Sequence, residues 1–517
     1  MFKCIIAQNR TKVKGFTEKR RTAMRYAKGI SILLALATLA AAVSCGSAAE
    51  SDPDAASGDN GTTATAEEST AEETRLEPEL PDVRYDGKTF RFLSRTSTDK
   101  VVRYYSEVRS DEENGETMND AVFARTLKIE EKYGVTISEE RVDDPSATYK
   151  RSFLAGDDNW EVVVESFSRL MPLAATGEYF TDINSIRYID LENPWWNTQT
   201  ANDLSVSGKV FAAIGAMNTW TDSHTNAVVF NKELAEQYSI DPYGMVDRNE
   251  WTIDNFSALT KDVTNDLDGN GTMDENDRYG ACGDYFEFLV MMTGCCADVV
   301  DHDENGIPRY NVGENFYSAA EKVSATMNSG DWLLAEKFQS RESDPWTNIL
   351  RKNFRAGNTL FYFGGIEQLL IFRDLDTDIG LLPVPKYDAG SEYRHTFTTY
   401  WSSIMAVSPI SPEQEMTGVL LEAMNAESYY GDAMAYYDVV LKHKAMRDED
   451  SIRMLEIIRS TRTMNFEYAF GYLGLQSMYN DVLNKGDVTS LTSKIASKLP
   501  AAEKKLDKAI GKITEKQ

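Results

Sequence analysis

Strand-like apolar runs alternate with amphipathic helical patterns over most of this chain, and this alternation limits the folds it can adopt. Residues 160–167 (WEVVVESF) form a β-branched run of the kind found in strands buried on both faces. Residues 88–95 (KTFRFLSR) and 135–142 (VTISEERV) are also predicted strands, and residues 117–134 between them form a predicted helix. Strands that alternate with helices predict an α/β fold with parallel sheets.

Further elements are predicted along the rest of the chain. The segments KVFAAIGAMN (209–218) and AVVFN (227–231) are predicted strands, and residues 412–430 and 448–462 are predicted amphipathic helices. The C-terminal tail is predicted as two helices that separate at Pro500. No G-x-S-x-G, G-x-x-x-x-G-K-[ST] or H-E-x-x-H motif occurs, so no recognised catalytic motif is present.

Length and charge restrict the partners. A chain of 517 residues is expected to form two or three domains. The formal net charge is −28, and the first 44 residues contribute +8, so the remaining body carries −36. An acidic body of this kind is repelled by nucleic acid phosphates and by anionic lipid headgroups. We therefore expect no nucleic acid partner.

The N-terminus predicts export. Residues 24–45 combine the basic Arg25 and Lys28 with an apolar run of about 14 residues, which suits a signal peptide and is too short for a membrane span. Small residues precede Cys45, as in a bacterial lipobox, in which the cysteine carries lipid, including palmitate. An ordinary signal peptide with an incidental Cys45 is the alternative. Residues 1–44 are therefore assigned to upstream sequence and signal peptide, with Met24 as a candidate start.

Residues 45–82 are predicted to be a lipidated cysteine followed by a disordered acidic linker. Between residues 46 and 81 the chain is small, polar and acidic, with only two leucines to bury. A tether of about 35 residues spans roughly 30 Å on average. The expected location is the extracellular face of the cell membrane, reached through the lipid anchor.

Cysteine and histidine usage predicts no catalytic metal site. Cys282, Cys295 and Cys296 lie close together, and export permits a disulfide from Cys282 to either of the other two. Buried free thiols are the alternative. The four histidines are scattered and show no ligand spacing.

The segment DLDGNGTMDEND, residues 266–277, has the oxygen spacing of an EF-hand calcium loop. The four aspartates on this short loop repel one another unless a cation lies among them. Gly280 and Gly283 oppose the second helix of a true EF-hand, so Ca²⁺ is predicted to be structural and remote from the ligand; a solvated acidic turn is the alternative. The predicted ligands are Asp266, Asp268, Asn270, Asp274, Asp277 and the carbonyl of Thr272.

Four stretches, in order, resemble the family 1 extracellular solute-binding proteins that serve ABC importers. These are AVVFNKELAEQYSID (227–241), EWTIDNFSALTKDV (250–263), the segment 378–409 that contains GLLPVPKY, and residues 435–458. The last stretch is similar to a branch common in Firmicutes lipoproteins. The resemblance implies a periplasmic-binding-protein-like fold of type II, with two lobes of parallel-rich sheets joined by a hinge.

The resemblance also implies how the chain divides. The N-lobe is expected to comprise residues 83–224 plus 403–445, and the C-lobe residues 225–402 plus 446–517. Lobes built from discontinuous segments can close about a hinge, and ligand contacts then stabilise the closed state. We expect a monomer that binds a carbohydrate between its lobes and meets the transmembrane subunits of an ABC permease.

Sugar rings present apolar faces and hydroxyl rims, which aromatic rings and polar side chains can match. The chain is 11% aromatic, with eight Trp and 25 Tyr, although most of these are expected in the core. Candidates were selected near the expected crossings between lobes and at strand ends, where α/β sheets gather ligand contacts. The predicted ligand-binding residues are Ser94, Arg95, Glu165, Trp196, Trp220, Tyr362, Tyr400 and Trp401.

These features lead to one main prediction and two alternatives. The main prediction is a lipid-anchored substrate-binding protein that captures an oligosaccharide, performs no chemistry on it and delivers it to a permease. The first alternative is a secreted glycan-active enzyme, which would need two carboxylates facing each other across a cleft. The second is a surface glycan-binding lipoprotein without a transporter. The sequence does not name the sugar.

Overall fold

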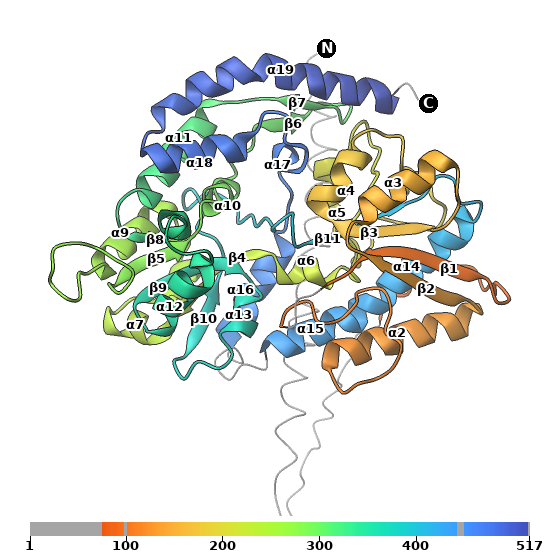
Figure 1. The fold of residues 1–517 in the computed structure, drawn as a ribbon, viewed down its shortest axis with the longest axis horizontal. Coiled ribbons are helices and arrows are strands. Elements are labelled where there is room, and N and C mark those ends of the chain that lie inside the picture. The colour runs from red at the N-terminus through yellow and green to blue at the C-terminus, as the bar shows by residue number, and fades with distance from the viewer. Residues whose placement is uncertain (1–74, 98–100, 442–448, 515–517) are drawn as a thin grey trace, which may run out of the picture. The chain divides into compact units, whose positions relative to one another are not determined.

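The computed structural model describes residues 75–97, 101–441 and 449–514, and Figure 1 shows their fold. The predicted signal peptide, the lipidation site Cys45 and nearly all of the predicted linker lie outside these ranges. Contacts divide the chain into residues 1–77 and residues 78–517, and the account below concerns the second unit. Within the described ranges, no helix has both the length and the apolar character needed to span a membrane.

The first sheet has four strands in the order β11-β3-β1-β2. Its strands are β1 (Thr89–Arg95), β2 (Thr136–Val142), β3 (Val162–Ser166) and β11 (Ser403–Val407). Strand β1 runs parallel to β2 and β3, whereas β11 is antiparallel to β3. The edge strand β11 therefore comes from a segment more than 200 residues further along the chain than β3.

Helices cover both faces of the four-stranded sheet (Figure 1). Phe90 and Phe92 of β1 pack in one apolar core, and α2 (Thr117–Tyr133) and α14 (Gln414–Tyr430) line this side. On the other face, Leu93 and residues of α3 (Pro145–Ala155) and α4 (Phe167–Ala174) form a second core. All five residues of β3 are buried, as the apolar run predicts for a strand covered on both sides.

The second sheet has five strands in the order β10-β4-β9-β5-β8. Strands β9, β5 and β8 are parallel, and β4 is antiparallel to both β9 and β10. Its strands are β4 (Asn226–Asn231), β5 (Tyr279–Gly283), β8 (Trp332–Leu334), β9 (Thr359–Gly365) and β10 (Ile379–Leu382).

The remaining elements are mostly short helices and one small hairpin. They are η1 (Ile183–Ser185), α5 (Thr198–Leu204), α6 (Thr219–Ser223), α7 (Lys232–Gln237), α8 (Pro242–Asp247), α9 (Ile253–Val263), α10 (Glu287–Gly294), β6 (Val300–His302), β7 (Pro308–Tyr310), α11 (Glu314–Met327), η2 (Ala335–Phe338), η3 (Trp346–Arg351), α12 (Lys352–Arg355), α13 (Gln368–Ile371), α15 (Asp432–Leu441), α16 (Glu449–Ser460), α17 (Phe466–Phe470), α18 (Leu475–Lys485) and α19 (Thr489–Thr514).

Two element predictions are wrong. Residues 209–218 form no strand, because the chain turns between Gly215 and Asn218 and leaves only isolated bridges, such as Ala213 with Met405. The tail is one helix, α19, that continues through Pro500. Pro500 lies on the exposed side of α19, where water can bind the carbonyl that loses its helical partner.

The cysteines of the body are free thiols. Cys282 and Cys295 are buried and Cys296 is exposed, and none of the three forms a disulfide. Burial raises the pKa of Cys295 to about 12. These thiols are therefore protonated at neutral pH. Of the two possibilities predicted from the sequence, buried free thiols rather than a disulfide apply to Cys282 and Cys295.

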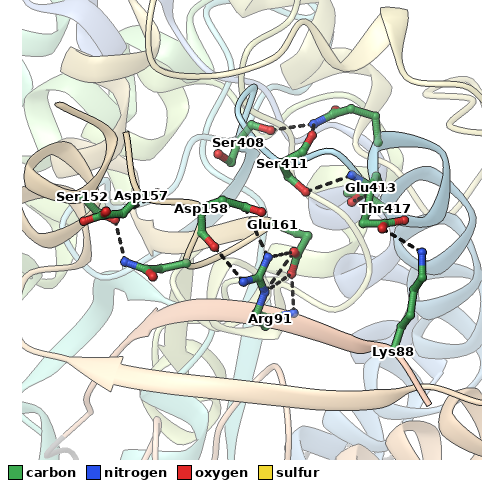
Figure 2. Close-up of polar contacts among 12 residues, drawn as sticks. Lys88, Arg91, Ser152, Asp157, Asp158, Glu161, Ser408, Ser411, Glu413 and Thr417 are labelled. Atoms are coloured by element: carbon green, nitrogen blue, oxygen red, sulfur yellow. Dashed lines mark hydrogen bonds and ion pairs between the residues drawn. The ribbon is translucent and has the colours of Figure 1, made fainter. Parts of the chain in front are cut away.

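A polar network holds the amino end of the four-stranded sheet (Figure 2). Glu161, which directly precedes β3 and is 1% exposed, pairs with the guanidinium of Arg91 on β1. Arg91 also donates to the carbonyl of Asp158 at 2.7 Å. Lys88 forms an ion pair of 2.7 Å with Glu413, just before α14. At this end of the sheet each of these charges has a partner within the protein.

Candidate functional site

The carboxyl edge of the four-stranded sheet is hollowed. The pocket lies where β1 and β3 end and the antiparallel β11 begins. This is the edge at which open α/β sheets gather ligand contacts. Five of the predicted ligand-binding residues line it, namely Ser94, Arg95, Glu165, Trp220 and Trp401.

Two of these residues come from the end of β1. The hydroxyl of Ser94 donates to Glu139 on β2, and Ser106 donates to the same carboxylate oxygen at 2.7 Å. Arg95 donates to the backbone carbonyl of Tyr400 at 3.0 Å, and its guanidinium lies 4.9 Å from the centre of the Tyr400 ring. Arg95 therefore holds the loop that carries the aromatic pair.

Glu165, near the end of β3, is a buried carboxyl group with spare capacity. Its side chain is 1% exposed, and one oxygen accepts the backbone N–H of Ser166 at 2.6 Å. The other oxygen and the hydroxyl of Ser166 form no hydrogen bond with any further residue of the protein, and the hydroxyl lies near enough to the carboxyl group to offset part of the effect of burial on its pKa. Burial raises the pKa of Glu165. The pocket floor thus offers hydrogen-bonding atoms that a guest can use, since buried polar groups are rarely left unpaired.

Tyr400 and Trp401 form an unusually open aromatic pair. They are 43% and 39% exposed, and their rings meet edge to face with centres 4.4 Å apart. Arg103 lies over the Trp401 ring at 4.1 Å and over the buried Trp220 ring at 5.8 Å. Tyr400 adjoins the pocket through Trp401 and Arg95. An exposed aromatic face beside polar groups matches the alternating apolar and hydroxyl surfaces of a sugar ring.

The structure places the other two predicted contacts away from this pocket. Trp196 is 5% exposed, and its indole N–H donates to Glu422 at 2.7 Å, beside the same contact from Trp195. Tyr362, 3% exposed, lies within β9 and packs edge-on against Phe354 and Phe372. Protein covers both rings, so neither presents a face to a guest.

Glu107 lines the pocket and was missed. Its carboxyl group is 3% exposed and accepts the backbone N–H of Trp220 at 2.6 Å. Burial raises its pKa to about 8. Glu107 lies in a segment with no regular secondary structure, where no hydrophobic period marks an inward position.

Four more acids, none of them predicted, gather at the carboxyl edge of the five-stranded sheet. Asp284 directly follows β5 and Glu287 begins α10; Glu336 follows β8 by two residues, and Glu367 follows β9 by two. Because β8, β5 and β9 are adjacent and parallel, their ends bring these acids to one place. The sequence pattern that could have indicated this group is an acid just after each of the three strands. The chain has 82 acidic residues, so a single acid after a strand does not stand out.

Arg103 links the two edges. It lies over Trp220 and Trp401 of the pocket, and its charge also acts on Glu367 of the acid group. Tyr468 is a second link. Its hydroxyl forms a hydrogen bond with Thr399, next to the aromatic pair, and burial and the charges of Asp284 and Glu287 raise its pKa. The backbone N–H of Glu367 donates to Ser223 of α6 at 3.0 Å. The two strand edges therefore belong to one neighbourhood.

The predicted calcium loop brings three carboxylates together. One oxygen from each of Asp266, Asp268 and Asp277 lies within 4.8 Å of the others. Backbone N–H groups of Gly271 and Gly269 bind Asp266 and lower its pKa, which keeps it charged. Such convergent oxygens suit Ca²⁺. Asn270 and Asp274 instead accept bonds from Thr272 and Asn276 within the loop.

Comparison with known proteins identifies the fold. No protein-family model matches this chain, and no curated protein matches it by sequence. Among solved structures, UspC of M. tuberculosis is similar with a TM-score of 0.52 and 14% identity over 80% of this chain and 99% of that one. A cyclo/maltodextrin-binding protein complexed with maltotetraose is similar with a TM-score of 0.50 and 13% identity over 84% and 98%.

A third similar structure is the GacH receptor of Streptomyces glaucescens, solved unliganded and with acarbose, with a TM-score of 0.50 and 14% identity over 81% of this chain and 99% of that one. At such identities the likeness concerns the fold alone. The predicted fold class is confirmed: this is a mixed α/β protein with parallel-rich sheets, of the two-lobed class that includes the maltodextrin-binding proteins. The neighbours are binding proteins rather than enzymes.

Proposed function

We propose that this chain is the substrate-binding protein of an ABC importer, which captures a carbohydrate, delivers it unaltered to the permease and is anchored outside the cell by lipid on Cys45. The observation that carries the proposal is the pocket at the carboxyl edge of the four-stranded sheet. There an open aromatic pair, Tyr400 and Trp401, stands beside buried oxygen atoms that have no partner in the protein.

The chemistry of the pocket favours a hydroxyl-rich guest. Burial raises the pKa of Glu107 to about 8, so at neutral pH this group carries a proton and can both donate and accept hydrogen bonds. Burial also raises the pKa of Glu165. The Ser166 hydroxyl can both donate and accept, and the Ser94 hydroxyl, which donates to Glu139, can accept. Sugar hydroxyls also donate and accept, and the aromatic pair supplies the flat apolar face that a sugar ring needs.

The rest of the proposal has other support. The signal peptide and lipobox pattern at residues 24–45 support export and lipid anchoring. The two-lobed fold, shared with binding proteins for maltotetraose and acarbose, supports carbohydrate capture and transport. A glycan-active enzyme remains the alternative, and a turnover test separates it.

The experiment is calorimetric titration of the full chain with neutral oligosaccharides of two to five units, followed by mass analysis of the recovered sugar. We expect micromolar or tighter binding of at least one series and return of the sugar unchanged. Trp401→Ala is expected to abolish most of this affinity, whereas Leu154→Ala, at an exposed apolar residue outside the pocket, serves as the control. Shortened sugar products would instead establish the enzyme.

We also propose that the 266–277 loop binds Ca²⁺ as a structural staple. Asp266, Asp268 and Asp277 would hold the ion, with the further loop oxygens completing its shell. The bound ion would offset the mutual repulsion of the carboxylates. No step of ligand capture depends on it.

A further inference from the structure

Four acids form a group at the carboxyl edge of the five-stranded sheet, namely Asp284, Glu287, Glu336 and Glu367. A site for a neutral sugar does not require so many acids in one place. Each carboxylate follows one of three adjacent parallel strands or begins the helix after it. Glycines give two of them room. A Cβ on Gly283 would lie 2.7 Å from Cγ of Glu287, and one on Gly365 would lie 1.9 Å from an oxygen of Glu367.

The protein binds one oxygen of Glu336 and of Glu367 and leaves the other oxygen of each open. Glu336 accepts the backbone N–H of Tyr285 at 2.9 Å, and Glu367 accepts from Gln368 at 3.0 Å. The second oxygen of each is buried without a partner. Asp284, in contrast, is held by the indole N–H of Trp346 and the backbone N–H of Phe286, both at 2.8 Å.

Glu287 is the strongest observation. Its side chain is 4% exposed, and one of its carboxylate oxygens has no hydrogen-bond partner. The charged groups that act on it are all acids, namely Asp284, Glu336 and Glu367. Burying an acid among acids is costly unless a positive charge joins them.

The residues that the structure describes supply little positive charge here. Arg351 acts on Glu367, but its guanidinium donates to Gln368 and Thr347, both at 3.3 Å, rather than to a carboxylate. Arg103 also acts on Glu367, but it lies over the rings of Trp220 and Trp401. Neither arginine is among the groups that act on Asp284, Glu287 or Glu336.

The spacing of the acids opposes a metal ion as the missing charge. Within the described part of the chain, the only acidic or thiol and imidazole groups whose ligand atoms converge within 4.8 Å are those of the 266–277 loop. The four carboxylates here are therefore too widely placed for three of them to share one Ca²⁺ or Mg²⁺. An ammonium group needs only one or two of these carboxylates as hydrogen-bond acceptors, so it does not require three of them to converge on one point.

We propose that these carboxylates receive a positively charged nitrogen of the bound solute, so that the guest is an amino-substituted saccharide rather than a neutral one. This inference rests on the proposed function, because it assigns the second half of the same site. The aromatic pair and serines would hold the ring and its hydroxyls, while the acids facing them select the ammonium group.

The test compares three β-1,4-linked tetrasaccharides that differ at one position of each ring. Cellotetraose carries hydroxyl groups, the chitin tetramer acetamido groups and the chitosan tetramer amino groups. Calorimetry is carried out on the full chain at pH 6.5, where the amino groups of the sugar carry substantial charge, and spermidine serves as a cation without a sugar ring. Because a hydrogen bond to a charged group contributes roughly 1.5 to 3 kcal/mol, the amino tetramer is expected to bind at least tenfold more tightly than either neutral one.

The variants assign that preference to the acids. Glu336→Gln keeps the size of the side chain and removes its charge, and is expected to weaken the amino tetramer about tenfold or more while leaving cellotetraose within twofold. Glu287→Gln provides the same test at the most buried acid, and Glu304→Gln, exposed in the turn between β6 and β7, is the charge control.

The outcomes separate this inference from the proposed function. Equal binding of the three tetramers, or loss of cellotetraose and amino tetramer together in Glu336→Gln, overturns the inference and leaves carbohydrate capture standing. Binding of spermidine with no binding of any saccharide supports a cation site and contradicts the proposed function. No binding of any of the four probes overturns the inference.

Discussion

The two ends of the four-stranded sheet differ in how their polar groups are used. At the amino end, Glu161 is buried and fully engaged, because Arg91 binds its carboxylate (Figure 2). At the carboxyl end, Glu165 on the same stretch of chain is equally buried, but one of its oxygens has no partner. Only three residues, all valines, lie between these two glutamates.

The difference separates a polar group that stabilises the fold from one that is available to bind a ligand. Pairing of Glu161 contributes to the folded state alone, since nothing is left for a guest. An unpartnered oxygen at Glu165 costs stability in the free protein, and a ligand can recover that cost. Aromatic residues divide in the same way, with Trp196 bonded inside the core and Trp401 open at the pocket.

The largest expected effect lies on the folding side of this comparison. Trp196→Ala removes a buried indole and leaves Glu422 without one of its donors. The free energy of unfolding should fall by roughly 3 to 5 kcal/mol, as for other buried aromatic residues replaced by alanine. Urea unfolding followed by fluorescence measures it. A loss below about 1 kcal/mol would mean that Trp196 is not the core residue described here.

The next effect concerns pH and the pocket end. Burial raises the pKa of Glu107 to about 8 from an ordinary value of 4.5, so the folded protein holds its proton more tightly than the unfolded chain. The resulting stability is fully present below pH 4.5 and is lost as pH rises through 8. Glu336 and Glu367, with pKa values raised to about 7 mainly by burial, act in the same direction.

We therefore expect the ligand-free protein to lose roughly 2 to 4 kcal/mol of unfolding free energy between pH 6 and pH 9. Glu107→Gln, which cannot titrate, should flatten much of this slope, and Glu304→Gln should not. Thermal unfolding at half-unit pH steps provides the measurement. If Glu107→Gln leaves the pH dependence of stability unchanged, groups other than Glu107 cause that dependence.

Trp401→Ala is expected to change the free energy of sugar binding, by less than the unfolding effects above, and to leave the free energy of unfolding nearly unchanged. Loss of the open ring should weaken sugar binding about tenfold to a hundredfold, in line with stacking and burial of one aromatic face. Its Tm should stay close to that of the parent, because the ring is 39% exposed. Calorimetry and thermal unfolding on the same sample compare this variant with Trp196→Ala, and equal loss of stability in both would remove the contrast between core and pocket.

Sequence reasoning found the sheets and only part of the site, for physical reasons. β-branched runs and strand ends predicted β1, β3 and the positions of Ser94 and Glu165, because both features are local. A tryptophan in a core and one at a rim look alike in sequence, so Trp196 was selected together with Trp401. The acids after β5, β8 and β9 became a group only through strand order, which is a non-local property.

The smallest expected effect concerns a third region, the 266–277 loop. The measurement shows whether the carboxylates of this loop are satisfied within the protein, like Glu161, or are open to a bound partner, like Glu165. Calcium at 1 mM should raise Tm by about 1 to 3 °C relative to chelator, as a weak extracellular site does by mass action. Asp268→Asn should abolish that shift, because Asp268 is one of the three convergent acids, and Glu304→Gln should retain it. Sugar affinity should be the same with and without calcium, since none of the loop acids lines the pocket. A Tm that chelator leaves unchanged would make these acids an ordinary solvated turn, whereas a loss of sugar affinity in chelator would assign the ion to recognition.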